Sequence, residues 1–142
     1  MKTSNRQVIP IFLILFANTI GLSQEIDKDD ISDITGCYTN LRYFPDSGDL
    51  GGVEFTILWS TEGYYVLVQW AEGGPEAPEL VKGTITGNSI RFSITIAGGE
   101  TDEFTGTVIN KVLVGRFKNG TLNPLTGKQE FRLPRKMSYW QK

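Results

Sequence analysis

The chain has 142 residues, with 14 basic and 16 acidic side chains, one cysteine and no histidine. This composition excludes Ser-His-Asp and Cys-His catalysis within the chain, a Cys/His set for zinc, and an intramolecular disulfide. We therefore predict no catalytic residues, no metal site and no cofactor, and a protein that is not an enzyme.

Residues 1–23 have the layout of a secretory signal peptide. Lys2 and Arg6 precede the apolar run 8–17, and the small residues Gly21 and Ser23 precede a cleavage site before Gln24. A membrane span needs about 20 apolar residues, which this run does not reach. We expect no transmembrane span after signal cleavage and a secreted or periplasmic protein.

The charge of the following chain is divided between its two parts. Residues 24–33 form an acidic lead-in, and residues 34–142 are expected to form a single domain. Residues 25–110 carry 15 acidic and 4 basic side chains, whereas residues 111–142 carry 8 basic and 1 acidic. The basic end either meets an anionic surface or neutralises the acidic strands within the fold. Nucleic acid is not an expected partner of an acidic secreted protein.

From Gly36 onward the sequence predicts strands separated by turns. Apolar and polar residues alternate in Val53–Trp59 and again in Ser89–Ile96, and the pairs Gly87-Asn88 and Asn110-Lys111 are two-residue turns. No segment shows a helical period. The fold class is all-β, an antiparallel up-and-down barrel of about eight strands, with a β-sandwich as the alternative. The predicted strands cover residues 36–44, 53–59, 64–70, 80–86, 89–96, 103–109, 111–117 and 128–134.

The glycines and the cysteine of these strands are expected to be structural. Gly83, Gly106 and Gly115 lie inside strands, where glycine marks a bend or a close backbone approach. Cys37 lies far from the apolar run and has no histidine to activate it. We interpret it as a packing residue of the first strand, while a pairing between two chains stays open.

The start of the first strand, ITGCYTN (34–40), resembles the opening of the calycin barrels, the lipocalins and avidins. Thr35, Gly36, Tyr38 and Asn40 match their Thr-Gly-x-Trp-x-Asn form, with tyrosine in place of tryptophan. Lipocalins also carry a basic residue near the end of the chain that packs on the first-strand aromatic, and Arg135 or Lys136 matches it in position. The resemblance implies a secreted barrel that binds a small molecule; no biotin site is carried over.

Two kinds of binding site are compatible with such a barrel. The first is an aromatic-lined site for a small apolar or amphipathic ligand, for which the candidates are Tyr38, Phe55, Trp59, Trp70 and Phe92. The same residues are also those that a small domain needs for its core.

The alternative is a protein-interaction module, such as an inhibitor or an immunity-type protein, that uses the outer barrel face. Strand 64–70 is apolar on both faces, so Tyr65 and Leu67 are expected to point outward beside the acidic loop 71–79. Its candidate residues are Tyr65, Leu67, Glu76 and Glu79. The same loop could instead cover these side chains.

Overall fold

The computed structural model describes residues 32–141. The predicted signal peptide and most of the acidic lead-in lie outside the described residues. No helix in the described part of the chain is long and apolar enough to cross a membrane.

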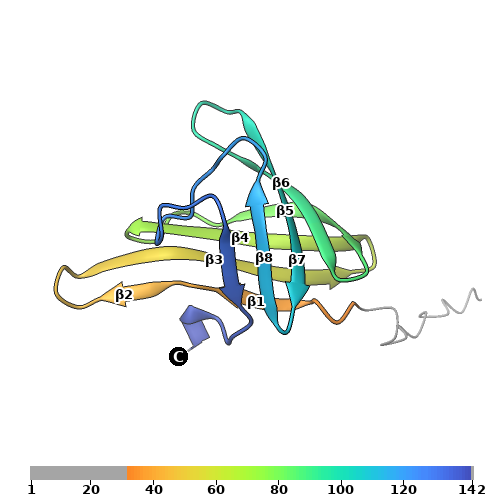
Figure 1. Cartoon of the computed structure of the whole chain (residues 1–142), viewed down its shortest axis with the longest axis horizontal. Coiled ribbons are helices and arrows are strands. Elements are labelled where there is room, and N and C mark those ends of the chain that lie inside the picture. Colours follow the sequence, from red (N-terminus) through yellow and green to blue (C-terminus); the bar gives the residue numbers. More distant parts are fainter. Residues whose placement is uncertain (1–31, 142) are drawn as a thin grey trace, which may run out of the picture.

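The described chain forms an antiparallel β-sheet that is nearly closed into a barrel, as predicted (Figure 1). From β3 to β9 each strand pairs with the next along the chain, and β1 and β2 both pair with β3, which gives the order β1-β3-β4-β5-β6-β7-β8-β9 with β2 beside this path. The strands are β1 (Gly36–Thr39), β2 (Arg42–Phe44), β3 (Asp49–Ser60), β4 (Gly63–Gly73), β5 (Glu79–Thr86), β6 (Ser89–Thr95), β7 (Thr101–Ile109), β8 (Val112–Phe117) and β9 (Phe131–Pro134), and a 3₁₀ turn, η2 (Tyr139–Gln141), ends the described chain.

Several strand boundaries differ from the prediction: β3 begins at Asp49 rather than Val53, β7 at Thr101 rather than Glu103, and β9 at Phe131 rather than Lys128. The first predicted strand is divided into β1 and β2, because the Asn40 side chain bonds to the Val53 backbone and interrupts the ladder. Strand β4 also continues beyond Trp70 to Gly73, since β3 is long enough to pair with it up to Leu50.

The barrel closes where β1 meets the end of β9. Tyr38 forms an antiparallel bridge with Arg135, and the Lys136 N–H donates to the Cys37 carbonyl over 3.0 Å. Few backbone hydrogen bonds join the sheet here, so side-chain contacts also hold the first and last strands together.

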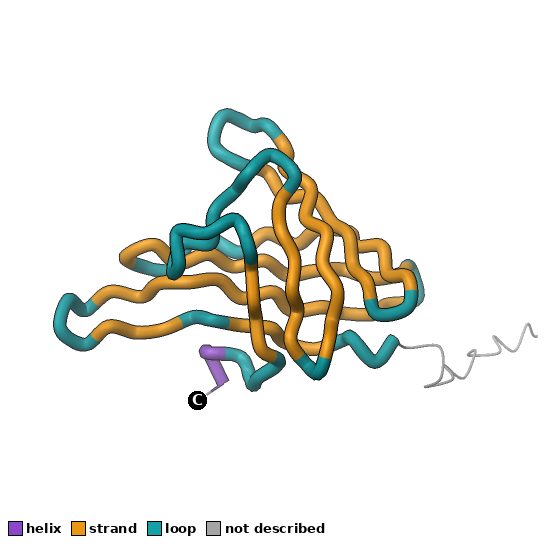
Figure 2. Tube along the Cα trace, viewed as in Figure 1, coloured by secondary structure: helices purple, strands orange, loops and turns teal. Residues whose placement is uncertain are grey.

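The two ends of the barrel differ in their connections (Figure 2). At the turn end, the two-residue connections 61–62, 87–88 and 110–111 join neighbouring strands. At the loop end lie the longer connections 45–48, 74–78, 96–100 and 118–130. Long loops on a rigid sheet are the usual place for binding residues, so the loop end is the first place to search for a site.

Six aromatic side chains fill the middle of the barrel, and we call them the ring cluster. Phe104 has ring-centroid distances of 5.0 Å to Phe92, 5.1 Å to Phe117 and 5.3 Å to Phe55. Aromatic pairs at such distances contribute about 0.5–1.5 kcal/mol each beyond their buried area. The ring cluster consists of Phe55, Trp70, Phe92, Phe104, Phe117 and Phe131.

A pair of glycines makes room for the ring cluster. Gly106 of β7 lies opposite Gly115 of β8. A Cβ at Gly115 would lie 2.5 Å from the Phe104 ring, and a Cβ at Gly106 would lie 2.6 Å from it. The prediction that these strand glycines mark a close approach is confirmed.

Candidate functional site

Three of the five predicted ligand residues belong to the packed interior. Tyr38 and Phe55 are fully buried and Phe92 is 3% exposed. Phe55 and Phe92 are members of the ring cluster, with centroids 5.3 Å apart. Side chains packed in this way are not available to a ligand unless neighbouring rings move, so a site has to lie elsewhere on the barrel.

The turn end is closed by the first described residues. The Ser32 N–H donates to the Tyr64 hydroxyl oxygen over 2.9 Å, and Ile34 is buried in the core. The Tyr38 hydroxyl donates to the Ile34 carbonyl, also over 2.9 Å. Burial raises the pKa of Tyr38, against the opposing effect of Arg135, so this hydroxyl remains a donor at neutral pH.

Arg135 holds this closure together from the other end of the chain. Its guanidinium donates to the carbonyls of Asp33, over 2.9 Å, and of Thr35. It lies directly over Gly36, where a Cβ would be 2.8 Å from Arg135 Nε. Within the described residues the ion pairs are Arg91–Glu103 and Arg132–Glu130, so no ion pair joins β1 to β9.

The two tryptophans among the predicted ligand residues lie at opposite ends of the barrel. Trp59 pairs with Tyr64 beside the turn 61–62, whereas Trp70 pairs with Val53 near the loop end. Trp59 lies six positions after Val53 in β3, which corresponds to about 20 Å along a strand. The two side chains therefore cannot line one small site.

Trp70 lies below a hollow of about 310 Å³ at the loop end, which we call the mouth hollow. The ring of Trp70 contacts Phe117 and Phe131 below it, with centroids 5.9 Å and 6.0 Å away, and is only partly buried. A volume of this size is at the lower limit of small-molecule pockets. The mouth hollow is lined by Trp70, Glu72, Glu76, Ile94, Thr95, Ile96, Ala97, Thr121, Leu122 and Pro124.

A buried carboxylate positions one wall of the mouth hollow. Asp102 of β7 is fully buried and accepts hydrogen bonds from the Asn119 N–H at 2.8 Å, the Thr121 N–H at 3.3 Å and the Thr121 hydroxyl at 2.6 Å. Burial favours a higher pKa for Asp102, but these hydrogen bonds and one from the Glu103 backbone outweigh it and lower the pKa below 3.8. At neutral pH the ionised carboxylate ties the loop 118–130 to the barrel wall.

A pair of asparagines anchors the same loop on its other side. Asn123 is buried, and its Oδ1 accepts from the Leu125 N–H at 3.0 Å and from the Asn40 amide at 3.2 Å. The Asn40 Oδ1 in turn accepts from the Val53 N–H at 2.8 Å. Loop 118–130 is therefore bonded to β7 and to the end of β1, and Thr121, Leu122 and Pro124 have fixed places in the wall.

Sequence analysis missed Asp102 and Asn123. A signal existed for Asp102, because alternation in β7 places it on the same face as Phe104 and Gly106, both of which are buried. A carboxylate on an inward face requires hydrogen-bond donors nearby. No comparable local signal marks Asn123, whose partners come from distant parts of the chain.

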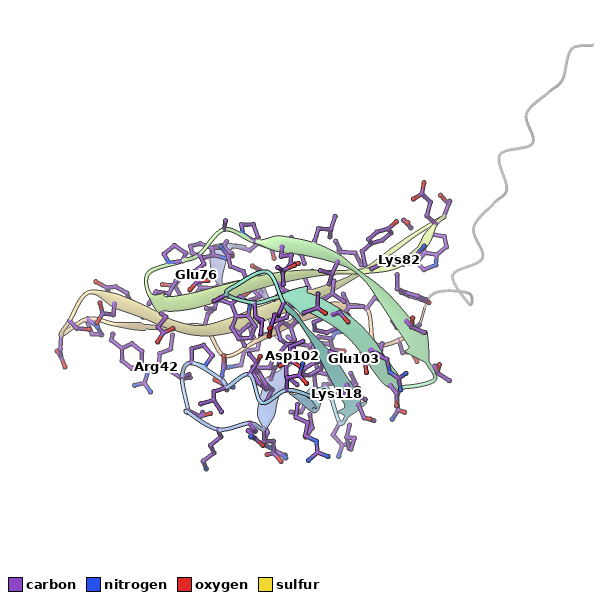
Figure 3. The ribbon with its side chains drawn as sticks, turned by 90° about the horizontal axis from the view of Figure 1, so that it is seen from above. Arg42, Glu76, Lys82, Asp102, Glu103 and Lys118 are labelled. Carbon is purple, nitrogen blue, oxygen red and sulfur yellow. The ribbon has the colours of Figure 1, made fainter. Side chains whose placement is uncertain are left out.

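The four predicted protein-interaction residues do not form one surface. Tyr65 and Leu67 lie on the outer face of β4, with the Tyr65 hydroxyl bonded to Glu62 over 3.1 Å. Glu76 lies on the rim of the mouth hollow, and Glu79 binds Thr95, accepting from its N–H and from its hydroxyl over 3.0 Å. In Figure 3, Glu76 lies toward the loop end and Lys82 of β5 toward the turn end.

The outer side of β4 is bordered by the end of the chain rather than by loop 71–79. That loop folds back on its own strand, because the Glu76 N–H donates to the Trp70 carbonyl and the Gln69 amide donates to the Glu76 carbonyl. Leu67 instead shares a hollow of about 400 Å³ with Trp140. This second hollow, the outer hollow, is lined by Cys37, Glu54, Thr56, Leu67, Gln69, Ser138, Trp140 and Gln141.

Cys37 and Glu54 are adjacent in the outer hollow. Glu54 is buried and accepts from the Ser138 hydroxyl at 2.5 Å and from the Tyr139 N–H at 2.9 Å. Burial, and next the charge of Glu54, raise the pKa of Cys37 to about 11. Cys37 is therefore a protonated, weakly nucleophilic thiol at neutral pH.

Within residues 32–141 there is no group of three or more acidic or cysteine side chains placed to hold a metal ion. No family model, curated protein or solved structure matches this chain in comparisons with known proteins.

Proposed function

We propose that this protein is a secreted or periplasmic binding module, and that a small apolar or amphipathic ligand docks in the mouth hollow on Trp70. The observation that carries this proposal is the position of Trp70, which is packed on Phe117 and Phe131 of the ring cluster and is only partly buried beneath a hollow of about 310 Å³. A rigidly supported aromatic ring offers a large contact area to a ligand at little cost in conformational entropy.

Two further observations support this proposal. The signal-like sequence of residues 1–23 favours secretion. The arrangement of Gly36, Tyr38 and Arg135 favours the comparison with calycins, since a basic residue near the chain end packs on the first strand beside its aromatic. The proposed activity is binding without catalysis.

The proposal predicts that a neutral apolar probe binds at Trp70. N-phenyl-1-naphthylamine should gain fluorescence with the wild-type protein, and Trp70→Ala should weaken its binding at least tenfold, because the ring forms the floor of the mouth hollow. Since Trp70→Ala also removes a member of the ring cluster, Leu122→Asp provides a second variant at a side chain that is 51% exposed. Fluorescence titration measures both.

The matched control is Trp59→Ala, which changes a tryptophan at the other end of the barrel and should leave probe binding unchanged. Wild-type affinity in both Trp70→Ala and Leu122→Asp would contradict the proposed site.

The second candidate function, a protein-interaction module, is favoured by one observation. Exposed leucines adjoin one another on the outer faces of β3, β4 and β5, where Leu67 lies directly opposite Leu80, and Leu58 lies opposite the half-buried Tyr65. Trp140 extends this surface, which we call the leucine face. Contiguous apolar side chains of this kind are typical of surfaces that bind another protein.

This alternative predicts a stoichiometric protein partner in the medium or periplasm of the native host. The partner should co-purify with the wild-type protein and be lost from the double variant Leu67→Glu, Leu80→Glu. Ile109→Glu is the control, because Ile109 is 56% exposed and lies on another strand. Recovery of the wild-type protein alone, without a stoichiometric partner, would argue against this function.

A further inference from the structure

The charged side chains that line the mouth hollow are all negative. In the part of the chain that the structure describes, its wall contains the carboxylates of Glu72 and Glu76 and no lysine or arginine. The remaining side chains are apolar or carry hydroxyl groups. In Figure 3 the labelled cations Lys82 and Lys118 lie apart from Glu76. Arg42 pairs with Gly51 in the same row of the sheet as Glu72, and its guanidinium lies over the Phe44 ring, 5.2 Å from the ring centroid. The hollow therefore combines an apolar floor with a negatively charged rim.

Within the described part of the chain, both rim carboxylates lack a partner for their side chains. Neither the Glu72 nor the Glu76 side chain has a hydrogen bond or an ion pair there. Nearby acidic residues behave differently: Asp102 accepts three hydrogen bonds from Asn119 and Thr121, and Glu79 is bonded to Thr95. Glu72 and Glu76 are thus the two carboxylates at the hollow that are free to bind another group.

The backbone of the intervening turn holds the two carboxylates at the rim. Ala71 and Pro75 form a β-bridge, and the Glu72 N–H donates to the Gly74 carbonyl over 3.2 Å. Gly73 between them adopts a φ of 86°, a conformation that glycine accepts without strain. The Glu76 N–H donates to the Trp70 carbonyl over 2.9 Å, which ties the rim directly to the floor.

We infer that the ligand of the mouth hollow is an organic cation, with its apolar part on Ile94, Ile96 and Leu122 and its charged group over Trp70 beside Glu72 and Glu76. A cation is attracted both by the face of an indole ring and by nearby carboxylates, whereas an anion is repelled by both. This inference rests on the proposed function, because it assigns the ligand class of the same site.

The test compares a cation with probes of the same shape and a different charge. Benzyltrimethylammonium, its neutral carbon isostere neopentylbenzene, and phenylmethanesulfonate each compete with N-phenyl-1-naphthylamine for the protein. The cation should displace the probe at a concentration at least tenfold lower than either of the others. Its advantage should shrink between 0.05 and 0.5 M salt, because the rim is exposed to solvent.

The double variant Glu72→Gln, Glu76→Gln should lose at least tenfold in affinity for benzyltrimethylammonium and keep its affinity for the neutral probe. Asp46 is a carboxylate of the 45–48 connection that does not line the hollow, so Asp46→Asn should change neither the affinity for the cation nor the affinity for the neutral probe. Equal displacement by the cation and its neutral isostere, or a double variant that binds the cation normally, would overturn the inference and leave the binding function standing. If no probe binds the wild-type protein, the proposed function fails together with the inference.

Discussion

Replacing Gly115 with alanine is expected to lower the free energy of unfolding by about 3 kcal/mol, at the upper end of the usual cost of overpacking a core. The new methyl group would lie 2.5 Å from the Phe104 ring and 2.5 Å from the Thr105 carbonyl oxygen. The second contact is with backbone, so no side-chain movement relieves it. Chemical denaturation followed by circular dichroism measures the loss.

Two glycines serve as comparisons for Gly115→Ala. Gly74→Ala should have little effect, because a Cβ at Gly74 meets nothing within 4 Å. Gly106→Ala should destabilise, but its close contacts are with the side chains of Phe104 and Leu113, so Phe104→Leu should partly rescue it and should not rescue Gly115→Ala. A Gly115→Ala protein as stable as wild type would show that β7 and β8 can separate without cost.

Replacing Asp102 with asparagine is expected to destabilise the protein by about 2–3 kcal/mol, since hydrogen bonds to a buried charged group are worth more than neutral ones and their loss leaves donors unpaired. Asparagine keeps one acceptor oxygen and places an NH₂ group against the donors of Thr121. The loop 118–130 would lose one of its anchors. Binding of N-phenyl-1-naphthylamine should therefore weaken together with stability.

The same residue predicts a dependence on pH. The pKa of Asp102 is lower in the folded chain than in the unfolded chain, so its stabilising contribution is present above about pH 4 and is lost as the pH falls through the folded pKa. Between pH 7 and pH 3 the free energy of unfolding should fall less in Asp102→Asn than in the wild-type protein. Glu100→Gln, at an exposed position of the 96–100 connection, should retain the wild-type profile.

The mouth hollow depends on parts of the chain that lie far apart in sequence. Trp70, Ile94 and Leu122 come from β4, β6 and the loop 118–130, and Asp102 fixes the loop to β7. A ligand at this site would contact the loop as well as the strands, so we expect binding to stabilise the loop end of the barrel.

Much of the fold was predictable because strand alternation is a local property. Ile90, Phe92 and Ile94 alternate with Arg91, Ser93 and Thr95, and the structure buries the first set and exposes the second. The turns at Gly87-Asn88 and Asn110-Lys111 could be predicted equally well, since such turn positions favour residues that tolerate a positive φ. Asn110 and Lys111 indeed have φ values of 49° and 63°.

The site could be predicted only in part, because alternation shows which face a residue is on but not how deep it lies. Tyr38, Phe55, Phe92 and Trp70 all point inward. Only the register of the paired strands decides that the first three lie in the packed interior and that Trp70 reaches the loop end. Register is a relation between distant segments, and a single sequence does not display it.

The all-β class, the turns, the inward faces of the strands and the absence of histidine chemistry could be predicted before folding is considered, because each of these follows from composition or from a period of two residues. The roles of the carboxylates, in contrast, depend on contacts between distant segments of the folded chain. Glu54 is buried under the chain end, Asp102 holds a loop, and Glu79 is bonded to Thr95. Within residues 32–141, Glu72 and Glu76 have no such partner beside Trp70, because folding brings hydrogen-bond donors to the other three carboxylates and not to these two.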